Sequence, residues 1–163
     1  MTESTPAGSP AEDPAKAATV ALLTPIQNGQ VLAAICSLNG IGGKVIETGA
    51  GAFAVLDDTS EGAVDKAGKA ISTFVKDRPM LAMERRDGQI TIHRWTAGVM
   101  GESLSPGFAL DDAPGAITTL MMGTETIDEL AKTHPDKVYD ANMGRLKAVK
   151  VLRKVAKEAK RNK

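Results

Sequence analysis

The chain has 163 residues, of which 42% are apolar and 25% are charged. This length suits one domain with a core of its own, and the single cysteine, Cys36, excludes a disulfide within the chain. No apolar run reaches the ~18–20 residues that a bilayer-spanning helix needs. The N-terminus has no secretory signal, so the sequence predicts a cytoplasmic protein.

Composition divides the chain into three parts. Residues 1–17 contain Pro6, Pro10 and Pro14 among Ser, Thr, Glu and Ala. Such a segment cannot bury enough apolar surface to offset its ordering entropy, and we expect a disordered tail. We expect an α+β domain at 18–134 and a basic amphipathic helix at 135–163.

Apolar spacing predicts seven elements between residues 19 and 95, in the order β-α-β-β-α-β-β. Short apolar or alternating runs predict five strands, at 19–24, 44–48, 52–56, 80–86 and 89–95. Apolar residues three and four positions apart predict two helices, at 26–38 and 64–75. The first six elements follow the split βαβ order of ferredoxin-like folds, in which two helices cover one face of an antiparallel sheet. The fifth strand is expected to extend this sheet at an edge.

Turn and capping residues support these boundaries. Asn39-Gly40 is typical of a helix end, and Gly49-Ala50-Gly51 has the length of a hairpin connection. Asp87-Gly88 favours a two-residue hairpin turn. Residues 57–60 (DDTS) offer several N-caps for the second helix.

The segment after residue 95 is predicted as a loop followed by two additional helices. Residues 96–113 are rich in Gly, Ser, Asp and Pro, which is typical of a surface loop. Pro114 suits the first position of a helix, which has apolar residues up to Leu130 and an interruption at Gly123. His134-Pro135 then separates this helix from the last one.

Groups for catalysis or metal binding are few. His93 and His134 are the only histidines, and with one cysteine beside them no metal-ligand spacing appears. His93 lies in mid-strand, on a face that we expect to be open, and Cys36 lies among apolar helix positions as a small buried side chain. We predict no catalytic residue, no metal and no cofactor, although acids distant in the sequence can converge in space.

Two further patterns have structural explanations. Residues 39–44 (NGIGGK) contain the glycines of a phosphate-binding loop, but Leu38 replaces a required glycine and Val45 replaces the Ser or Thr after the lysine. The segment also leads from a helix into a strand, whereas a phosphate loop leads from a strand into a helix. The paired acids Asp57-Asp58 and Asp111-Asp112 each precede a predicted helix, where capping explains them.

The C-terminal segment carries the strongest functional signal. From Arg145 to Lys163 there are nine basic residues and one acid, Glu158, so this segment carries +8 and residues 1–144 carry −8. At 100° per residue the apolar side chains fall on one arc and the cations on the opposite arc, with Leu146 alone out of place. The predicted anion- or partner-binding residues are Lys147, Lys150, Arg153, Lys154, Lys157, Lys160 and Arg161.

This cationic face favours an anionic partner. Like charges three and four residues apart repel, and Glu158 alone can relieve them. Nucleic acid, a ribonucleoprotein or an acidic protein surface fits, including the acidic body of a second copy in a homodimer. A membrane is disfavoured because the apolar side of the helix carries mainly Ala and Val. A helix packed on the domain with a solvated lysine face explains the same pattern without a partner.

The sequence therefore supports two functional hypotheses. The first is a non-enzymatic binding or accessory protein that docks through its basic C-terminal helix on nucleic acid or a ribonucleoprotein. The alternative is a small-molecule-sensing or enzymatic α+β domain, with a pocket near the Gly49–Gly51 turn or in the 96–113 loop.

Overall fold

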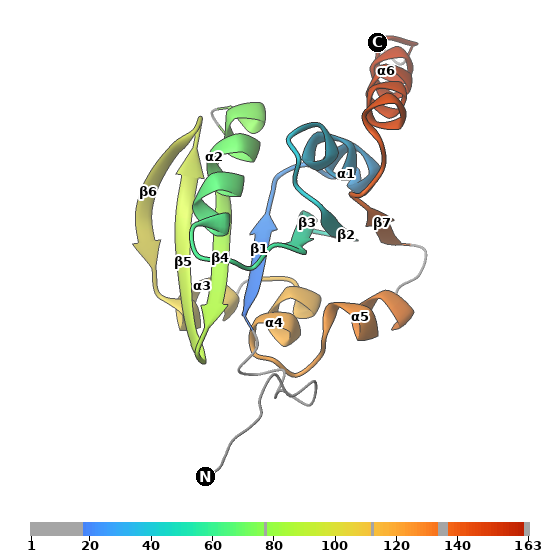
Figure 1. The fold of residues 1–163 in the computed structure, drawn as a ribbon. Helices are drawn as coiled ribbons and strands as arrows, with labels where there is room; N and C mark the ends of the chain where they lie inside the picture. The colour runs from blue at the N-terminus through green and yellow to red at the C-terminus, as the bar shows by residue number, and fades with distance from the viewer. Residues whose placement is uncertain (1–17, 77, 112, 134–136, 162–163) are drawn as a thin grey trace.

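The computed structural model describes residues 18–76, 78–111, 113–133 and 137–161 (Figure 1). The tail predicted at 1–17 lies outside these residues. The strands are β1 (Thr19–Leu23), β2 (Gly43–Thr48), β3 (Gly51–Leu56), β4 (Met80–Arg86), β5 (Gln89–Thr96), β6 (Val99–Leu104) and β7 (Val138–Asp140). The helices are α1 (Gly29–Leu38), α2 (Ala63–Val75), α3 (Pro106–Asp111), α4 (Gly115–Met121), α5 (Ile127–Thr133) and α6 (Arg145–Arg161).

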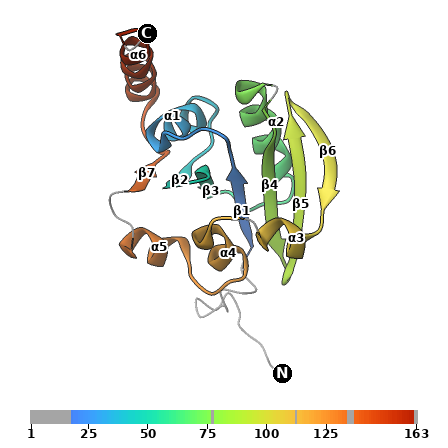
Figure 2. The ribbon, with the colours of Figure 1, turned by 180° about the vertical axis from the view of Figure 1, so that it is seen from behind.

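The described strands form one antiparallel sheet in the order β6-β5-β4-β1-β3-β2-β7. β1 lies at its centre, with Leu22 paired to Ala54 of β3 on one side and to Ala82 of β4 on the other. The chain is therefore an α+β protein with an open sheet, as predicted. The two edges of the sheet are β6 and β7, which lie on opposite sides of the molecule in Figures 1 and 2.

Helices cover both faces of the sheet, whereas the sequence predicted a cover on one face only. On the first face, α1 and α2 bury a core that includes Leu22, Leu32 and Ile71. On the second face, α3, α4 and α5 bury another core, which includes Phe53 and Ile117 (Figure 2). The alternation of side chains along each strand supplies both cores, since successive residues point to opposite faces.

The predicted first helix begins at Gly29 instead of residue 26, whereas its predicted end and both predicted hairpin turns are confirmed. α1 ends at the Asn39 C-cap, and Gly40 adopts a positive φ of 71°. Thr48 pairs with Gly51, so Gly49 and Ala50 form a two-residue turn between β2 and β3. Asp87 and Gly88 both have positive φ, as a type I′ turn between β4 and β5 requires.

The prediction of a surface loop at 96–113 is wrong. This segment contains the edge strand β6 and the short helix α3, so β5 is an inner strand instead of the edge. Ala97 and Gly98, with φ of 50° and 82°, form the turn that returns the chain into β6. The turn is held to the end of α2, where the Ala97 N–H donates to the Lys76 carbonyl oxygen at 2.9 Å. Tertiary contacts thus impose a hairpin turn at a position where local composition indicates only a loop.

Two smaller predictions also need correction. The helix predicted from Pro114 to Leu130 is two helices, α4 and α5, separated where Gly123 adopts a φ of 78°. The residues 57–60 do not cap α2, whose N-cap is Gly62 and has no side-chain cap hydrogen bond. Asp58 instead accepts from the Ser60 N–H and hydroxyl, and these hydrogen bonds lower its pKa.

The segment before the last helix contains an additional strand, β7, which pairs Tyr139 with Val45 of β2. α6 begins only at Arg145, where the Ala148 N–H donates to the Gly144 carbonyl oxygen. Among the described residues, no helix has the length and apolar character needed to cross a membrane.

Candidate functional site

The first turns of α6 are anchored to α1. Ala148 is fully buried and Val151 nearly so, and both pack against Ala34 of α1. Ser37 of α1 also donates a hydrogen bond to the Met143 carbonyl oxygen, just before the helix begins. The small side chains on the apolar side of α6 therefore allow close packing of the two helices.

The second half of α6 has less support from the body. Val155 is half-buried and Ala156 is exposed, while Figures 1 and 2 show the C-terminal turns of α6 extending past α1. The helix thus packs on the domain at its start and extends from it at its end.

The cations of α6 lie on one continuous face, which we call the cationic face. Its described side chains are all exposed, and within the described part of the chain none of them forms an ion pair or a hydrogen bond. These five residues are Lys147, Lys150, Arg153, Lys154 and Lys157. Lys160 and Arg161 belong to the same helix, but their side chains lie outside the described part.

The geometry of this face suits a row of anions. With 100° per residue, the five cations fall within an arc of about 120°, and with a rise of 1.5 Å per residue Lys147 and Lys157 are about 15 Å apart along the axis. Leu146 lies within the same arc and is 82% exposed, so one apolar side chain interrupts the face. Exposed ammonium and guanidinium groups in a row can bind successive phosphates or carboxylates.

The other candidate residues have structural surroundings. His93 is half-buried on the side of the sheet that α2 covers. The prediction that this residue lies on an open face of the sheet is therefore wrong. Its cleft of about 190 Å³ is also lined by Glu84, Thr91 and Trp95. His134 lies outside the described residues.

Cys36 is a buried hydrophobic residue, as predicted. It lies within the core under α1, and burial raises the pKa of its thiol to about 12. A thiol with such a pKa stays protonated at physiological pH and is a poor nucleophile.

The glycine-rich segment after α1 is a structural connection. It leads from α1 into β2, as predicted, with positive φ at Gly40 and Gly43. Gly42 packs so closely against Asn142 that a Cβ atom there would meet the amide oxygen. The segment thus joins α1 to the residues that precede α6. Across the described ranges, no group of three or more His, Cys, Asp or Glu residues is arranged to hold a metal ion.

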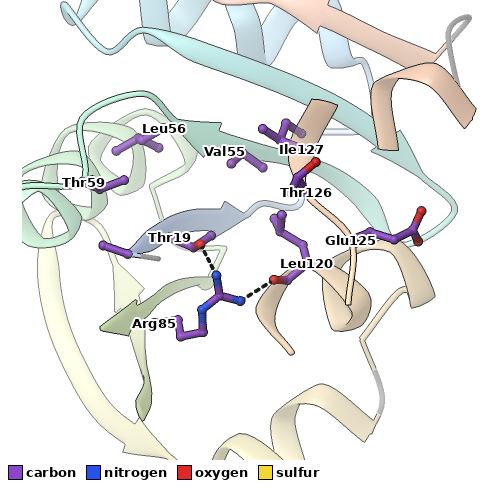
Figure 3. Close-up of a pocket in the computed structure, with 10 residues that line it drawn as sticks. Thr19, Val55, Leu56, Thr59, Arg85, Leu120, Glu125, Thr126 and Ile127 are labelled. Atoms are coloured by element: carbon purple, nitrogen blue, oxygen red, sulfur yellow. Dashed lines mark hydrogen bonds between the residues drawn. The ribbon is translucent and has the colours of Figure 1, made fainter. Parts of the chain in front are cut away.

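Arg85 is a buried polar residue that the sequence analysis did not single out. It lies on β4, is only 4% exposed, and donates to the carbonyl oxygens of Leu120 and Met121 at 2.8 and 3.1 Å (Figure 3). Its other terminal nitrogen donates to the Thr19 hydroxyl at 2.8 Å. The guanidinium thus neutralises the negative end of the α4 dipole. The one signal in the sequence is an arginine at an inward-facing position of a strand.

A cavity of about 180 Å³ lies beside Arg85. Its walls are mainly apolar, with Thr19, Thr59, Glu125 and Thr126 at the margin (Figure 3). A more open groove of about 590 Å³ lies between α3 and α4, lined by Pro106, Leu110 and Met122 among others. This groove includes part of the 96–113 segment for which a pocket was predicted.

Comparison with known proteins adds no assignment, because no family model, no curated protein and no solved structure matches this chain.

Proposed function

We propose that this chain is a non-enzymatic binding or accessory protein that docks through the cationic face of α6 on the phosphates of nucleic acid, alone or within a ribonucleoprotein. The observation that carries the proposal is a row of five exposed cations without ionic partners among the described residues. In a helix selected for stability alone, acidic residues three or four positions away would relieve the repulsion between neighbouring cations. Phosphates bound along the face would provide that relief.

The placement of α6 supports this proposal. The helix lies at the β7 side of the sheet, and its outer turns extend past α1, so a long polyanion can approach without meeting the acidic body. The body holds the opposite charge, −8 over residues 1–144, which would repel a polyanion elsewhere on the surface. Contact is thereby directed to one face of the molecule.

Recognition through phosphates fits better than recognition of stacked bases. RNA-binding sheets present aromatic side chains on an open face, on which the bases stack. Here helices cover both faces of the sheet, Phe53 and Trp95 are buried in the two cores, and Tyr139 of β7 is half-buried against the first core. We therefore propose binding that is largely independent of sequence.

Two further proposals concern the context of this function. The β4-β1-β3-β2 order, with α1 and α2 on one face, supports a ferredoxin-like assignment for the core of the fold. A cytoplasmic location, where nucleic acid is accessible, fits a chain whose one cysteine is a buried thiol.

A second candidate function is small-molecule binding. It is supported by the open groove between α3 and α4, where exposed Met122 lies beside the apolar residues Ile90 and Leu110. A metabolite released from the purified protein by denaturation would favour this function over nucleic-acid binding.

The test compares charge reversals on and off the cationic face. We expect the wild type to bind duplex and single-stranded nucleic acid at low salt. Reversal of four exposed lysines on α6 should abolish this binding while the fold survives, because the buried side of α6 is unchanged; the changes are Lys147→Glu, Lys150→Glu, Lys154→Glu and Lys157→Glu.

A matched control reverses four exposed lysines away from α6, namely Lys66→Glu, Lys69→Glu, Lys76→Glu and Lys132→Glu. This variant has the same net charge as the first, so it separates a specific face from a general charge effect. It should retain most of the binding. If the wild type binds neither duplex nor single-stranded nucleic acid at low salt, the proposal is refuted and an acidic protein surface is left as the partner. An equal loss of nucleic-acid binding in both variants would refute the role of α6 as the binding face.

A further inference from the structure

The two edges of the sheet differ in a way that affects assembly. β7 is an edge of three residues, and α6 follows it closely in the chain. β6 is twice as long, and five of its six residues are exposed. An edge strand presents unpaired N–H and C=O groups, and proteins usually protect it by shortness, by proline, by charged side chains, above all lysine, or by a bulge. β6 has a bulge and one charge, Glu102, which is paired with Arg94. β6 (VMGESL) contains neither lysine nor proline.

Exposed apolar side chains are concentrated around this edge. Of the six large hydrophobic residues that are exposed in the described chain, two belong to β6, Val99 and Met100. Phe108 belongs to α3, which directly follows β6, and Phe74 lies at the end of α2 that contacts the β5–β6 turn. Exposed apolar side chains on an unpaired strand, and on the helices beside it, favour an interaction surface.

We propose that β6 pairs antiparallel with β6 of a second copy of this chain, about a two-fold axis between Gly101 and Glu102. In this register Val99 of one copy lies opposite Leu104 of the other, and Met100 lies opposite Ser103. The interface is isologous, so each contact occurs twice.

The bulge in β6 makes this self-pairing geometrically consistent. The β5–β6 register shifts between His93 and Trp95, so that Gly101 and Glu102 both lie opposite Arg94. Opposed residues in an antiparallel pair must point to the same face. Leu104 packs in the core on the α3–α5 face, and Met100 lines the cleft on the α2 face, which places Val99 on the same face as Leu104. In a regular strand these two residues, five positions apart, would point to opposite faces.

Charge complementarity also favours a second copy. Arg94 donates to the Glu102 carboxylate at 2.7 Å, and both side chains are largely exposed. In the proposed register Glu102 of the second copy lies opposite Gly101, where no side chain separates it from Arg94. Two arginines and two carboxylates then alternate around the axis, and each arginine relieves the repulsion between the two carboxylates.

The pairing leaves the proposed nucleic-acid interface free. β6 and β7 are opposite edges of the sheet, so α6 of each copy would lie at a far end of a continuous sheet. The dimer stands independently of the function proposed for α6.

The test measures the mass of the full-length protein by light scattering and sedimentation over a range of concentrations. We expect twice the chain mass of 17.0 kDa. Val99→Lys should raise the dimer dissociation constant at least about tenfold, because it places a charge in the apolar pair. The control Met122→Lys, also at an exposed apolar residue but away from β6, should remain dimeric.

A mixing experiment tests the register. Arg94→Glu and Glu102→Arg should each be monomeric alone, because each makes all four charges at the axis alike. Mixed together they should form a heterodimer, since two positive groups of one chain then meet two negative groups of the other. A wild type with the mass of one chain at every concentration overturns the dimer. The assignment of β6 as the interface would be overturned if Val99→Lys and Met122→Lys had the same mass. It would also be overturned if the mixture of Arg94→Glu and Glu102→Arg stayed monomeric.

Discussion

The guanidinium of Arg85 binds the carbonyl oxygens at the C-terminal end of α4. A helix leaves its last carbonyl groups without partners, and a buried cation there also favours the helix dipole. Because Arg85 lies on β4 and also donates to Thr19 of β1, it ties α4 to the centre of the sheet.

Replacement of Arg85 by methionine should therefore be costly. The variant would remove the guanidinium donor from the Met121 carbonyl oxygen and one of the donors to the Leu120 carbonyl oxygen, and we expect the free energy of unfolding to fall by about 1–3 kcal/mol. Denaturant titration measures this loss. Arg78→Met is the control, because Arg78 is exposed and makes one long hydrogen bond to the Pro25 carbonyl oxygen. Equal stability of the two variants would contradict a structural role for Arg85.

Cys36 gives a prediction about alkaline pH. Burial raises the pKa of its thiol from 9.0 to about 12, so the folded state holds a proton that the unfolded state releases above pH 9. The stability associated with this proton is complete below pH 9 and is lost as the pH rises toward 12. We expect the free energy of unfolding to fall by up to about 1.4 kcal/mol per pH unit in this range.

Comparison with Cys36→Ala isolates this contribution, because the variant lacks the thiol but keeps the other groups that titrate. Stability measured at several pH values should fall less steeply in Cys36→Ala. A native thiol that reacts with a disulfide reagent at pH 8 as fast as in the unfolded protein would show that Cys36 is not protected.

At the scale of elements, the hairpin turns differ in how well their residues suit them. Asp87-Gly88 is a preferred type I′ pair and was predicted from the sequence, whereas Ala97 adopts a φ of 50° that alanine disfavours. The Ala97-Gly98 turn is held by α2 through the Lys76 carbonyl oxygen and the Ser72 hydroxyl. Tertiary hydrogen bonds therefore impose a turn that the local sequence does not favour.

Ala97→Asn should relieve this strain. Asn-Gly is a preferred pair for a type I′ turn, and Ala97 is exposed, so we expect the free energy of unfolding to rise by about 0.5–1 kcal/mol. Ala50→Asn, in the two-residue turn between β2 and β3, is the control and should have little effect because Ala50 does not have a positive φ. Thermal unfolding measures both, and a destabilised Ala97→Asn would contradict the assigned turn.

The elements that local patterns specify were predictable, and those that depend on tertiary contacts were not. α1 and the first two hairpins follow from apolar spacing and glycine turns. α5 has a local signal in the sequence, since Thr126 and Glu129 are spaced as a capping box and form its reciprocal hydrogen bonds. β7 has no local sequence signal that would define it, because three residues are too few to show the alternation of apolar residues typical of a strand. This strand forms through its pairing with β2.

At the scale of the whole molecule, the second layer of helices was the main feature beyond the sequence analysis. Strand alternation predicts which residues share a face, but it does not show whether a face is covered by later segments of the chain. The apolar residues of short helices such as α3 and α4 do not indicate which surface they cover, so their packing on Phe53 and Ile92 could not be read from the sequence. The cationic face, in contrast, was predictable from charge spacing alone, because it needs only one long helix.

The proposed binding function depends on how charge is divided along the chain. An acidic body carries a helix with a net positive charge at one side of its sheet, and the described cations of that helix have no ionic partners within the described chain. Association with a polyanion should then depend on counterion release, which has a quantitative signature in salt.

The most direct test is the salt dependence of duplex binding by the wild type and by Lys150→Gln. For the wild type, the logarithm of the association constant should fall linearly with the logarithm of salt concentration, with a slope of about −0.9 for each phosphate contacted. Removal of the exposed Lys150 ammonium should make the slope shallower by about 0.9, without a change in the fold. Binding that does not respond to salt, or an unchanged slope in Lys150→Gln, would contradict the account that α6 binds nucleic acid through its phosphates.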